Sequence, residues 1–240
     1  MSNDEIFFLC VLTGAEEILG IENPTEGFSE EEAKKKWGEV SNNLYENQII
    51  YNKNSEIHIS DYYAKISEAI SFPDVAFEYT RDAQEKNYVY IRGSIYVSLK
   101  KRKDEELKIK LYDNREDFIE FLIKEFMLSH CDSDISIMLS EFEMDKALDF
   151  HRKGKPEQAL ELFNQKDFDF DELQIAIELF LENKCSIDFI GYRNNQETPS
   201  QALFRSIKTE KGTWLYKIWN SNTKICKCSI DKALSEALYF

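Results

Sequence analysis

Seven tyrosine, arginine and lysine residues on consecutive predicted strands are the side chains best suited to recognition chemistry. Alternate residues of a strand point to opposite faces, so the tyrosines between residues 88 and 96 are predicted to lie opposite the aliphatic series between 89 and 99. Tyrosine and arginine are enriched at the hot spots of protein interfaces, which favours a surface for an acidic or mixed protein partner. They are equally common on solvated antiparallel faces, where cross-strand pairs stabilise the sheet, and both interpretations stay open. The predicted partner-binding residues are Tyr88, Tyr90, Arg92, Tyr96, Lys108, Lys110 and Tyr112.

No other group of residues has the spacing of a catalytic or metal-binding motif. Adjacent residues cannot converge easily on one ion, so His130-Cys131-Asp132 is interpreted as a loop. Cys226 and Cys228 lack the two-residue spacer of a redox motif, and the dispersed glycines form neither a phosphate loop nor a dinucleotide fingerprint. No serine or cysteine lies in a nucleophile elbow. The prediction is a protein that is not an enzyme and has no catalytic residues, no metal and no cofactor.

The composition excludes several classes of partner. The chain has 240 residues and a net charge of −15, which makes nucleic acid an unfavourable partner because phosphate binding needs clustered positive charge. Apolar residues make up 42% of the chain and aromatic residues 13%, which excludes a disordered chain. Five scattered cysteines do not form a disulfide framework. The apolar run Ile6–Leu12 follows an acidic start and is too short for a membrane span of about 20 residues. The prediction is a cytoplasmic protein that binds neither nucleic acid nor membrane.

The periodicity of apolar residues predicts the elements that position these side chains. A helix, or a strand that leads into a helix, is expected at 6–20, and helices are expected at 29–47 and 61–71. Three antiparallel strands at 75–80, 88–100 and 107–112 and a helix at 115–129 are expected to follow. The second half is expected to begin with helices at 133–153, from 156 and from 169. Strands are then expected at 186–193, 201–208, 213–219 and 224–230, before a last helix at 231–239.

The two strand regions carry an internal repeat. Phe77, Arg81 and Gln84-Glu85 match Phe189, Arg193 and Gln196-Glu197 at a constant spacing of 112 residues. Each region is followed by an aspartate and an amphipathic helix. The prediction is an α+β fold of two similar halves, residues 1–130 and 131–240, each with helices, an antiparallel sheet and a closing helix. Such halves usually pack about a pseudo-twofold axis, and we expect them to form one rigid unit.

This layout resembles that of a known family. The helices that carry Leu12-Thr-Gly-Ala-Glu-Glu-Ile-Leu-Gly20, Trp37–Leu44 and Ile66–Ile70, the last followed by Pro73, precede the sheet and its closing helix, and the whole then repeats. The order resembles that of the EspG-type chaperones of ESX (type VII) secretion systems, and especially a firmicute relative of them. The resemblance implies a cytoplasmic, non-enzymatic chaperone or adaptor that binds the helical tip of a secreted protein, keeps it soluble and presents it for export. It transfers no individual site residue. An immunity protein that neutralises a toxin and an enzyme of unrecognised mechanism remain as alternatives.

Overall fold

The computed structural model divides the chain into two compact units. Unit 1 comprises Met1–Phe118 with Arg193–Pro199, and unit 2 comprises Ile119–Tyr192 with Ser200–Phe240. The residues that the structure describes are 1–81, 85–101, 107–129, 135–162, 186–193, 200–209, 212–219, 222–227 and 229–238. The predicted division into residues 1–130 and 131–240 stays a prediction.

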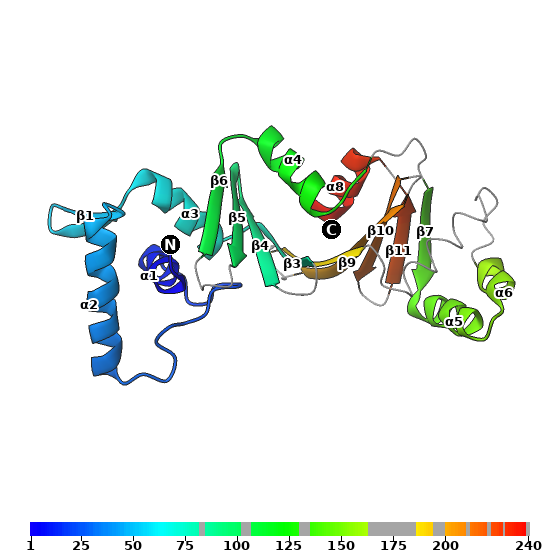
Figure 1. Cartoon of the computed structure of the whole chain (residues 1–240), viewed down its shortest axis with the longest axis horizontal. Helices are drawn as coiled ribbons and strands as arrows, with labels where there is room; N and C mark the ends of the chain where they lie inside the picture. Colours follow the sequence, from blue (N-terminus) through cyan, green and yellow to red (C-terminus); the bar gives the residue numbers. More distant parts are fainter. Residues whose placement is uncertain are drawn as a thin grey trace. The chain divides into compact units, whose positions relative to one another are not determined.

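Unit 1 contains helices, a hairpin and an antiparallel sheet (Figure 1). The elements in chain order are α1 (Asn3–Thr13), α2 (Glu30–Glu46), β1 (Ile50–Lys53), β2 (Glu56–Ile59), α3 (Asp61–Ser71), β3 (Val75–Arg81), β4 (Glu85–Arg92), β5 (Ile95–Lys101) and β6 (Leu107–Tyr112). The sheet has the order β6-β5-β4-β3, and β1 and β2 pair separately. Helix α4 (Arg115–Glu125) begins in this unit and ends in unit 2.

Unit 2 contains further strands and its own helices. The elements are β7 (Ile135–Ser140), α5 (Glu141–Arg152), α6 (Pro156–Glu161), β8 (Ser186–Arg193), β9 (Ser200–Thr209), β10 (Gly212–Trp219), β11 (Asn222–Lys227) and α8 (Ile230–Leu238). The strand order is β8-β9-β10-β11-β7, in which β9, β10, β11 and β7 pair antiparallel.

The α+β fold class is confirmed, and the order of elements repeats. Strands β3 to β6 lead into α4, and strands β8 to β11 lead into α8. Phe77 on β3 and Phe189 on β8, which match in the sequence repeat, are both buried. The pseudo-twofold relation between the halves is not confirmed by this order and stays a prediction.

The helices begin where the sequence supplies caps. Ser2 and Ser29 each form a capping box with the glutamate three residues later, which satisfies backbone N–H groups in the first turn. Helix α1 then buries Ile6, Leu9 and Cys10. Its neighbour α3 follows β2 directly and packs against both α1 and the β4–β5 part of the sheet.

Two of the predicted elements change type or number in the structure. The strand predicted at 88–100 is two strands, because a two-residue turn at Gly93-Ser94 reverses the chain, and Gly93 has a positive φ of 54°. The helix predicted at 133–153 is instead strand β7 followed by α5, whose capping box at Ser140 and Glu143 starts the helix later. The strand at 50–53 was not predicted. The predicted helix from residue 169 lies outside the described residues.

Candidate protein-binding surface

The seven predicted binding residues do not lie on one face of the sheet. Antiparallel partners share a face, and the register pairs Arg92 with Ile95 and Tyr90 with Val97. Tyr96 instead pairs with Ile91 on β4 and with Tyr112 on β6. Tyr88, Tyr90 and Arg92 therefore lie on one face, and Tyr96, Lys108, Lys110 and Tyr112 lie on the other. The single tyrosine-basic surface predicted from alternation is wrong, because the Gly93-Ser94 turn reverses the chain and places Ile95 on the same face as Arg92.

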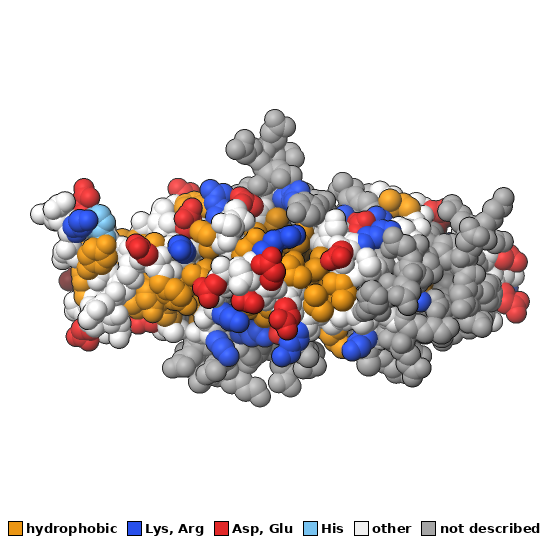
Figure 2. All heavy atoms as spheres, turned by 90° about the horizontal axis from the view of Figure 1, so that it is seen from above, with side chains coloured by type: hydrophobic (Ala, Val, Ile, Leu, Met, Phe, Trp, Pro, Cys, Tyr) orange, Lys and Arg blue, Asp and Glu red, His pale blue; other side chains and the backbone are white. Residues whose placement is uncertain are grey.

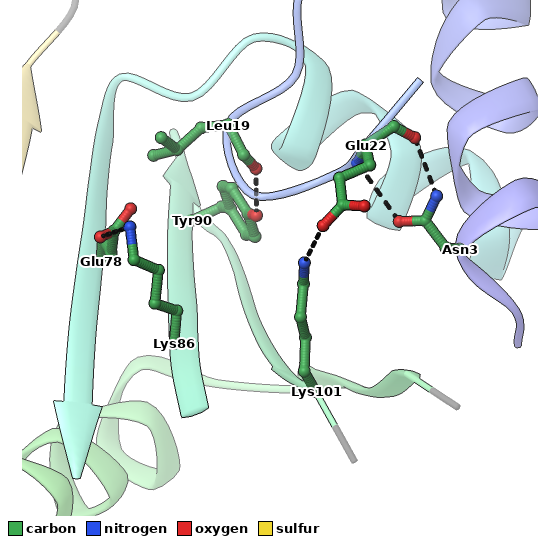
Figure 3. Close-up of polar contacts among 7 residues, drawn as sticks. All are labelled: Asn3, Leu19, Glu22, Glu78, Lys86, Tyr90 and Lys101. Carbon is green, nitrogen blue, oxygen red and sulfur yellow. Dashed lines mark hydrogen bonds and ion pairs between the residues drawn. The ribbon is translucent and has the colours of Figure 1, made fainter. Parts of the chain in front are cut away.

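Tyr88 and Tyr90 are buried under the segment that joins α1 to α2. The Tyr90 hydroxyl donates a hydrogen bond of 2.7 Å to the carbonyl of Leu19 (Figure 3). Gly20 follows directly and lies against the Tyr88 ring, so close that a methyl group there would be 2.6 Å from Cε2 and Cζ. Burial raises the pKa of Tyr90 well above its ordinary value of 10.0 and keeps the hydroxyl protonated. These two tyrosines hold a chain segment in place.

Polar contacts tether the same segment at Glu22 (Figure 3). The Glu22 carboxylate lies 3.0 Å from Nζ of Lys101, and the Asn3 amide binds both the carbonyl and the N–H of Glu22 at 2.8 and 3.3 Å. On the same face of the sheet, Lys86 pairs with Glu78 at 2.7 Å. The segment therefore covers the sheet at several points, which removes Tyr88 and Tyr90 from any binding surface.

The opposite face is covered at Tyr96 and Tyr112. The Phe118 ring of α4 stacks on Tyr96 with centroids 4.6 Å apart and meets Tyr112 edge-on at 5.5 Å. Lys110 lies over the Tyr112 ring at 4.4 Å. Lys108 and Lys110 are exposed, as is much of the Arg92 side chain, which donates to Asp74 at 2.8 Å. Of the seven residues, Lys108 and Lys110 are exposed, Arg92 and Tyr96 are half-buried, and Tyr88, Tyr90 and Tyr112 are buried.

A prediction for the Tyr90 hydroxyl follows from its burial and its bond to Leu19. Tyr90→Phe is expected to lower the free energy of unfolding by about 1 kcal/mol, since the Leu19 carbonyl loses its donor. Tyrosine is charged when it is deprotonated. A pKa that is raised in the folded state therefore contributes stability that is fully present below the unfolded-state pKa of about 10. This contribution is lost as the pH rises through the folded-state pKa. Burial also raises the pKa of Tyr216, so both phenols contribute to this alkaline loss.

Urea denaturation between pH 8 and pH 11 measures both effects. Tyr90→Phe is expected to flatten the alkaline slope, whereas Tyr62→Phe, at an exposed position, is the matched control and is expected to change neither value. An unchanged alkaline slope in Tyr90→Phe would contradict the assignment.

An exposed apolar group, which was not predicted, lies where α1 and α3 end. Val11, Leu12 and Phe72 expose 42%, 36% and 38% of their side chains, and we call them the α1–α3 patch. Thr13 bonds to Ser67 at 3.0 Å, and the Phe72 ring lies 3.9 Å from a methyl group placed at Gly14, so the two helix ends are adjacent. Because α1 is apolar on every side, some of its side chains must remain exposed unless another element covers them. That all-round pattern is the sequence signal for the patch.

Exposed acidic residues border this patch. Glu68 lies one turn before Phe72 on α3, and Glu16 and Glu17 follow the Gly14 cap of α1. Further hydrophobic side chains gather over the β1–β2 hairpin and α3 (Figure 2). They include Tyr51, Ile57 and Tyr62, and the Tyr51 ring stacks on His58 with centroids 5.7 Å apart. Unit 1 therefore combines an apolar patch with an acidic border.

The described residues offer little reactive chemistry. They contain no group of three or more His, Cys, Asp or Glu side chains that could hold a metal ion. Burial raises the pKa of the Cys10 thiol to about 11, so it is protonated at neutral pH and a poor nucleophile. His130-Cys131-Asp132 lies outside the described residues. Within the part of the chain that is described, no helix is long and apolar enough to cross a membrane.

The comparisons with known proteins give a relation of fold. Neither a protein-family model nor a curated protein matches the sequence. Among solved structures, the chain is similar to the Mycobacterium tuberculosis type VII secretion system chaperone EspG5, determined in complex with the PE25–PPE41 dimer. The match has a TM-score of 0.58 and covers 100% of this chain and 96% of EspG5, with 9% sequence identity. The chain therefore shares the fold of a type VII secretion chaperone over its whole length.

Proposed function

We propose that this protein is a non-enzymatic chaperone or adaptor that binds substrates of a type VII-like secretion system. The observation that carries the proposal is the fold similarity to EspG5, which extends over the whole chain. The solved EspG5 complex contains a bound PE25–PPE41 dimer, which supports a protein partner here. The proposed partner is a helical secreted protein, bound in the cytoplasm before export.

The α1–α3 patch is the proposed contact surface for a helix of the substrate. Its three exposed side chains supply the apolar centre, and the carboxylates of Glu16, Glu17 and Glu68 form a charged border. Interfaces with an apolar core and a polar rim are typical of specific recognition. The complementary substrate is an amphipathic helix with an apolar stripe flanked by lysine or arginine. Such an association weakens as salt screens the charges.

Co-expression with small helical secreted proteins tests the proposal. The chain is expected to raise the soluble yield of its substrate and to form a complex on gel filtration. Leu12→Lys is expected to weaken binding tenfold or more, because it places a cation in the apolar centre next to a basic partner. Phe142→Lys, an equally drastic change at an exposed site of unit 2, is the control and is expected to bind normally.

Two results would overturn the proposal. If no helical secreted protein gains solubility or forms a complex, the chaperone function is wrong. If the complex forms but Leu12→Lys binds as tightly as the unchanged protein, the function stands and the α1–α3 patch is wrong. Arg92, Lys108 and Lys110 remain proposed contacts for an acidic part of the partner. Lys108→Glu with Lys110→Glu is expected to weaken the complex, with Lys35→Glu and Lys53→Glu as the control of equal charge.

The net charge of −15 favours one second candidate, an immunity protein that covers a basic toxin site. Both candidates predict binding that weakens with salt. They differ in the cell, because an immunity protein restores growth when its toxin is expressed, and a chaperone raises the amount of substrate that is exported. Growth rescue without any effect on export would favour the second candidate.

A further inference from the structure

Strand β7 is the outermost of the strands that the structure describes in the sheet of unit 2. It pairs antiparallel with β11, with Met138 opposite Lys224 and Ser136 opposite Cys226. Among the described strands, none pairs with its other side. An edge strand presents a row of backbone N–H and C=O groups that can pair with another strand.

The edge strand β6 of unit 1 provides an internal comparison. Lys108 and Lys110 occupy exposed positions on β6, and lysines on an edge strand oppose pairing with further strands. Strand β7 has the sequence Ile-Ser-Ile-Met-Leu-Ser, with no charged residue, no proline and no glycine. The lysines that oppose strand pairing are therefore present on β6, and β7 has no charged residue.

The most exposed large apolar side chains among the described residues lie on β7 and just beyond its end in the sequence. Met138 on β7 is 57% exposed and Phe142, two residues beyond the end of the strand, is 74% exposed. These are the highest values among the large hydrophobic side chains that the structure describes. Ser136 and Ser140 on the same strand are also exposed. This side of β7 thus combines backbone groups that pair with no described strand and exposed apolar side chains. Main-chain hydrogen bonds give the affinity when a strand is added to a sheet.

From this combination we infer that β7 pairs antiparallel with β7 of a second copy of the chain. A twofold axis through residue 137 places Met138 of one copy opposite Ser136 of the partner subunit. The numbers of residues opposite each other then differ by an even number, so each face of one sheet continues as the same face of the other. The interface is self-complementary, as a twofold contact requires. Two copies of β6 joined in the same way would bring lysines together, whereas two copies of β7 bring no like charges together. This pairing is independent of the proposed substrate surface in unit 1.

The charge of the chain fixes how the dimer responds to salt. Each copy carries a net charge of −15, so two copies repel each other at long range, while the strands that pair are uncharged. Added salt screens this repulsion without weakening the backbone hydrogen bonds appreciably. The dimer is expected to tighten as the salt concentration increases. Binding of the proposed amphipathic substrate helix is expected to weaken under the same change.

Sedimentation equilibrium over a range of protein concentrations, at low and high salt, tests the dimer. The unchanged chain and the control Met138→Leu are expected to pass from monomer to dimer. Met138→Lys and Met138→Glu are each expected to weaken dimerisation at least tenfold, because the introduced like charges lie within about 8 Å of each other across the axis. An equimolar mixture of these two variants is expected to form a mixed dimer, since the charges then attract.

The outcomes distinguish a second copy from any other occupant of the edge. A chain that stays monomeric at every concentration and salt overturns the inference, including the case in which a strand of a different protein pairs with β7. Dimers that persist unchanged in Met138→Lys and Met138→Glu place the interface elsewhere. Failure of the mixture to dimerise contradicts the twofold register. Thermal melts followed by circular dichroism check that each variant is folded, which is expected because Met138 is exposed.

Discussion

Gly20→Ala is expected to lower the free energy of unfolding by about 2–4 kcal/mol. Two costs combine at this position. Gly20 has a φ of 78°, a left-handed conformation that costs a residue with a Cβ about 1–2 kcal/mol. The added methyl group would also lie 2.6 Å from the Tyr88 ring, which is buried and stacked beside Tyr90 with centroids 6.3 Å apart. The ring cannot move aside without disturbing the cover over the sheet.

Gly27→Ala is the matched control for the first cost alone. Gly27 has a φ of 79°, almost the same as Gly20, but no atom lies within 4 Å of a methyl group placed there. Its loss is expected to be about 1–2 kcal/mol, and the difference between the two variants in urea denaturation measures the contact with Tyr88. The second variant Tyr88→Leu should reduce this difference when it is combined with Gly20→Ala. Equal losses for Gly20→Ala and Gly27→Ala would contradict the close packing of the segment on the sheet.

The elements of this fold could be predicted where the sequence contains local signals. The Ser29 and Glu32 capping box marks the start of α2, and strands β9, β10 and β11 lie within two or three residues of their predicted ranges. The boundary of α5 was missed although Ser140 and Glu143 form the same capping box. Strand β7 contains enough apolar residues to fit a helical pattern as well, and periodicity alone cannot separate the two for so short a run.

The candidate surface could not be predicted correctly because one turn controls the faces of two strands. Alternation identifies a face only within one strand, and the two residues Gly93-Ser94 place Ile95 on the same face as Arg92. Burial of Tyr90 depends on Leu19, which is 71 residues away in the sequence. No local sequence pattern indicates a contact between residues so far apart in the chain. The exposed side chains of the α1–α3 patch depend in the same way on which elements cover a helix that is apolar on every side.

Phe189→Ala is expected to cost more than any change at the surface, about 3–5 kcal/mol of unfolding free energy. The Phe189 ring lies in the middle of a stack of three buried rings in unit 2. Its centroid is 4.2 Å from that of Phe126 at the end of α4 and 4.9 Å from that of Phe204 on β9, with interplanar angles of 4° and 5°. Removing the middle ring leaves a cavity between two aromatic faces and removes both stacking contacts.

Hydrogen bonds limit how far the structure can collapse into that cavity. Beyond α4, the carbonyls of Phe126 and Met127 accept hydrogen bonds from Ser206 at 2.6 Å and from Thr213 at 3.1 Å. These bonds tie the helix end to β9 and β10, so the Phe126 ring cannot approach Phe204 without breaking them. The loss of unfolding free energy in Phe189→Ala is therefore expected in the upper part of its range, because the cost of a core truncation rises with the volume of the cavity that remains.

Chemical denaturation of three variants separates the stack from simple loss of apolar area. Phe189→Leu keeps most of the volume and is expected to lose less than half as much as Phe189→Ala, whereas Phe142→Ala, at a 74% exposed position, is expected to change stability by less than about 0.5 kcal/mol. Equal losses for Phe189→Ala and Phe142→Ala would show that the three rings do not form the core of unit 2. Phe189 is also the residue that the repeat aligns with buried Phe77, so the repeat identified a core position in both strands. A large loss of stability in Phe189→Ala would explain why the repeat has phenylalanine at both Phe77 and Phe189, because both side chains would be needed for core packing.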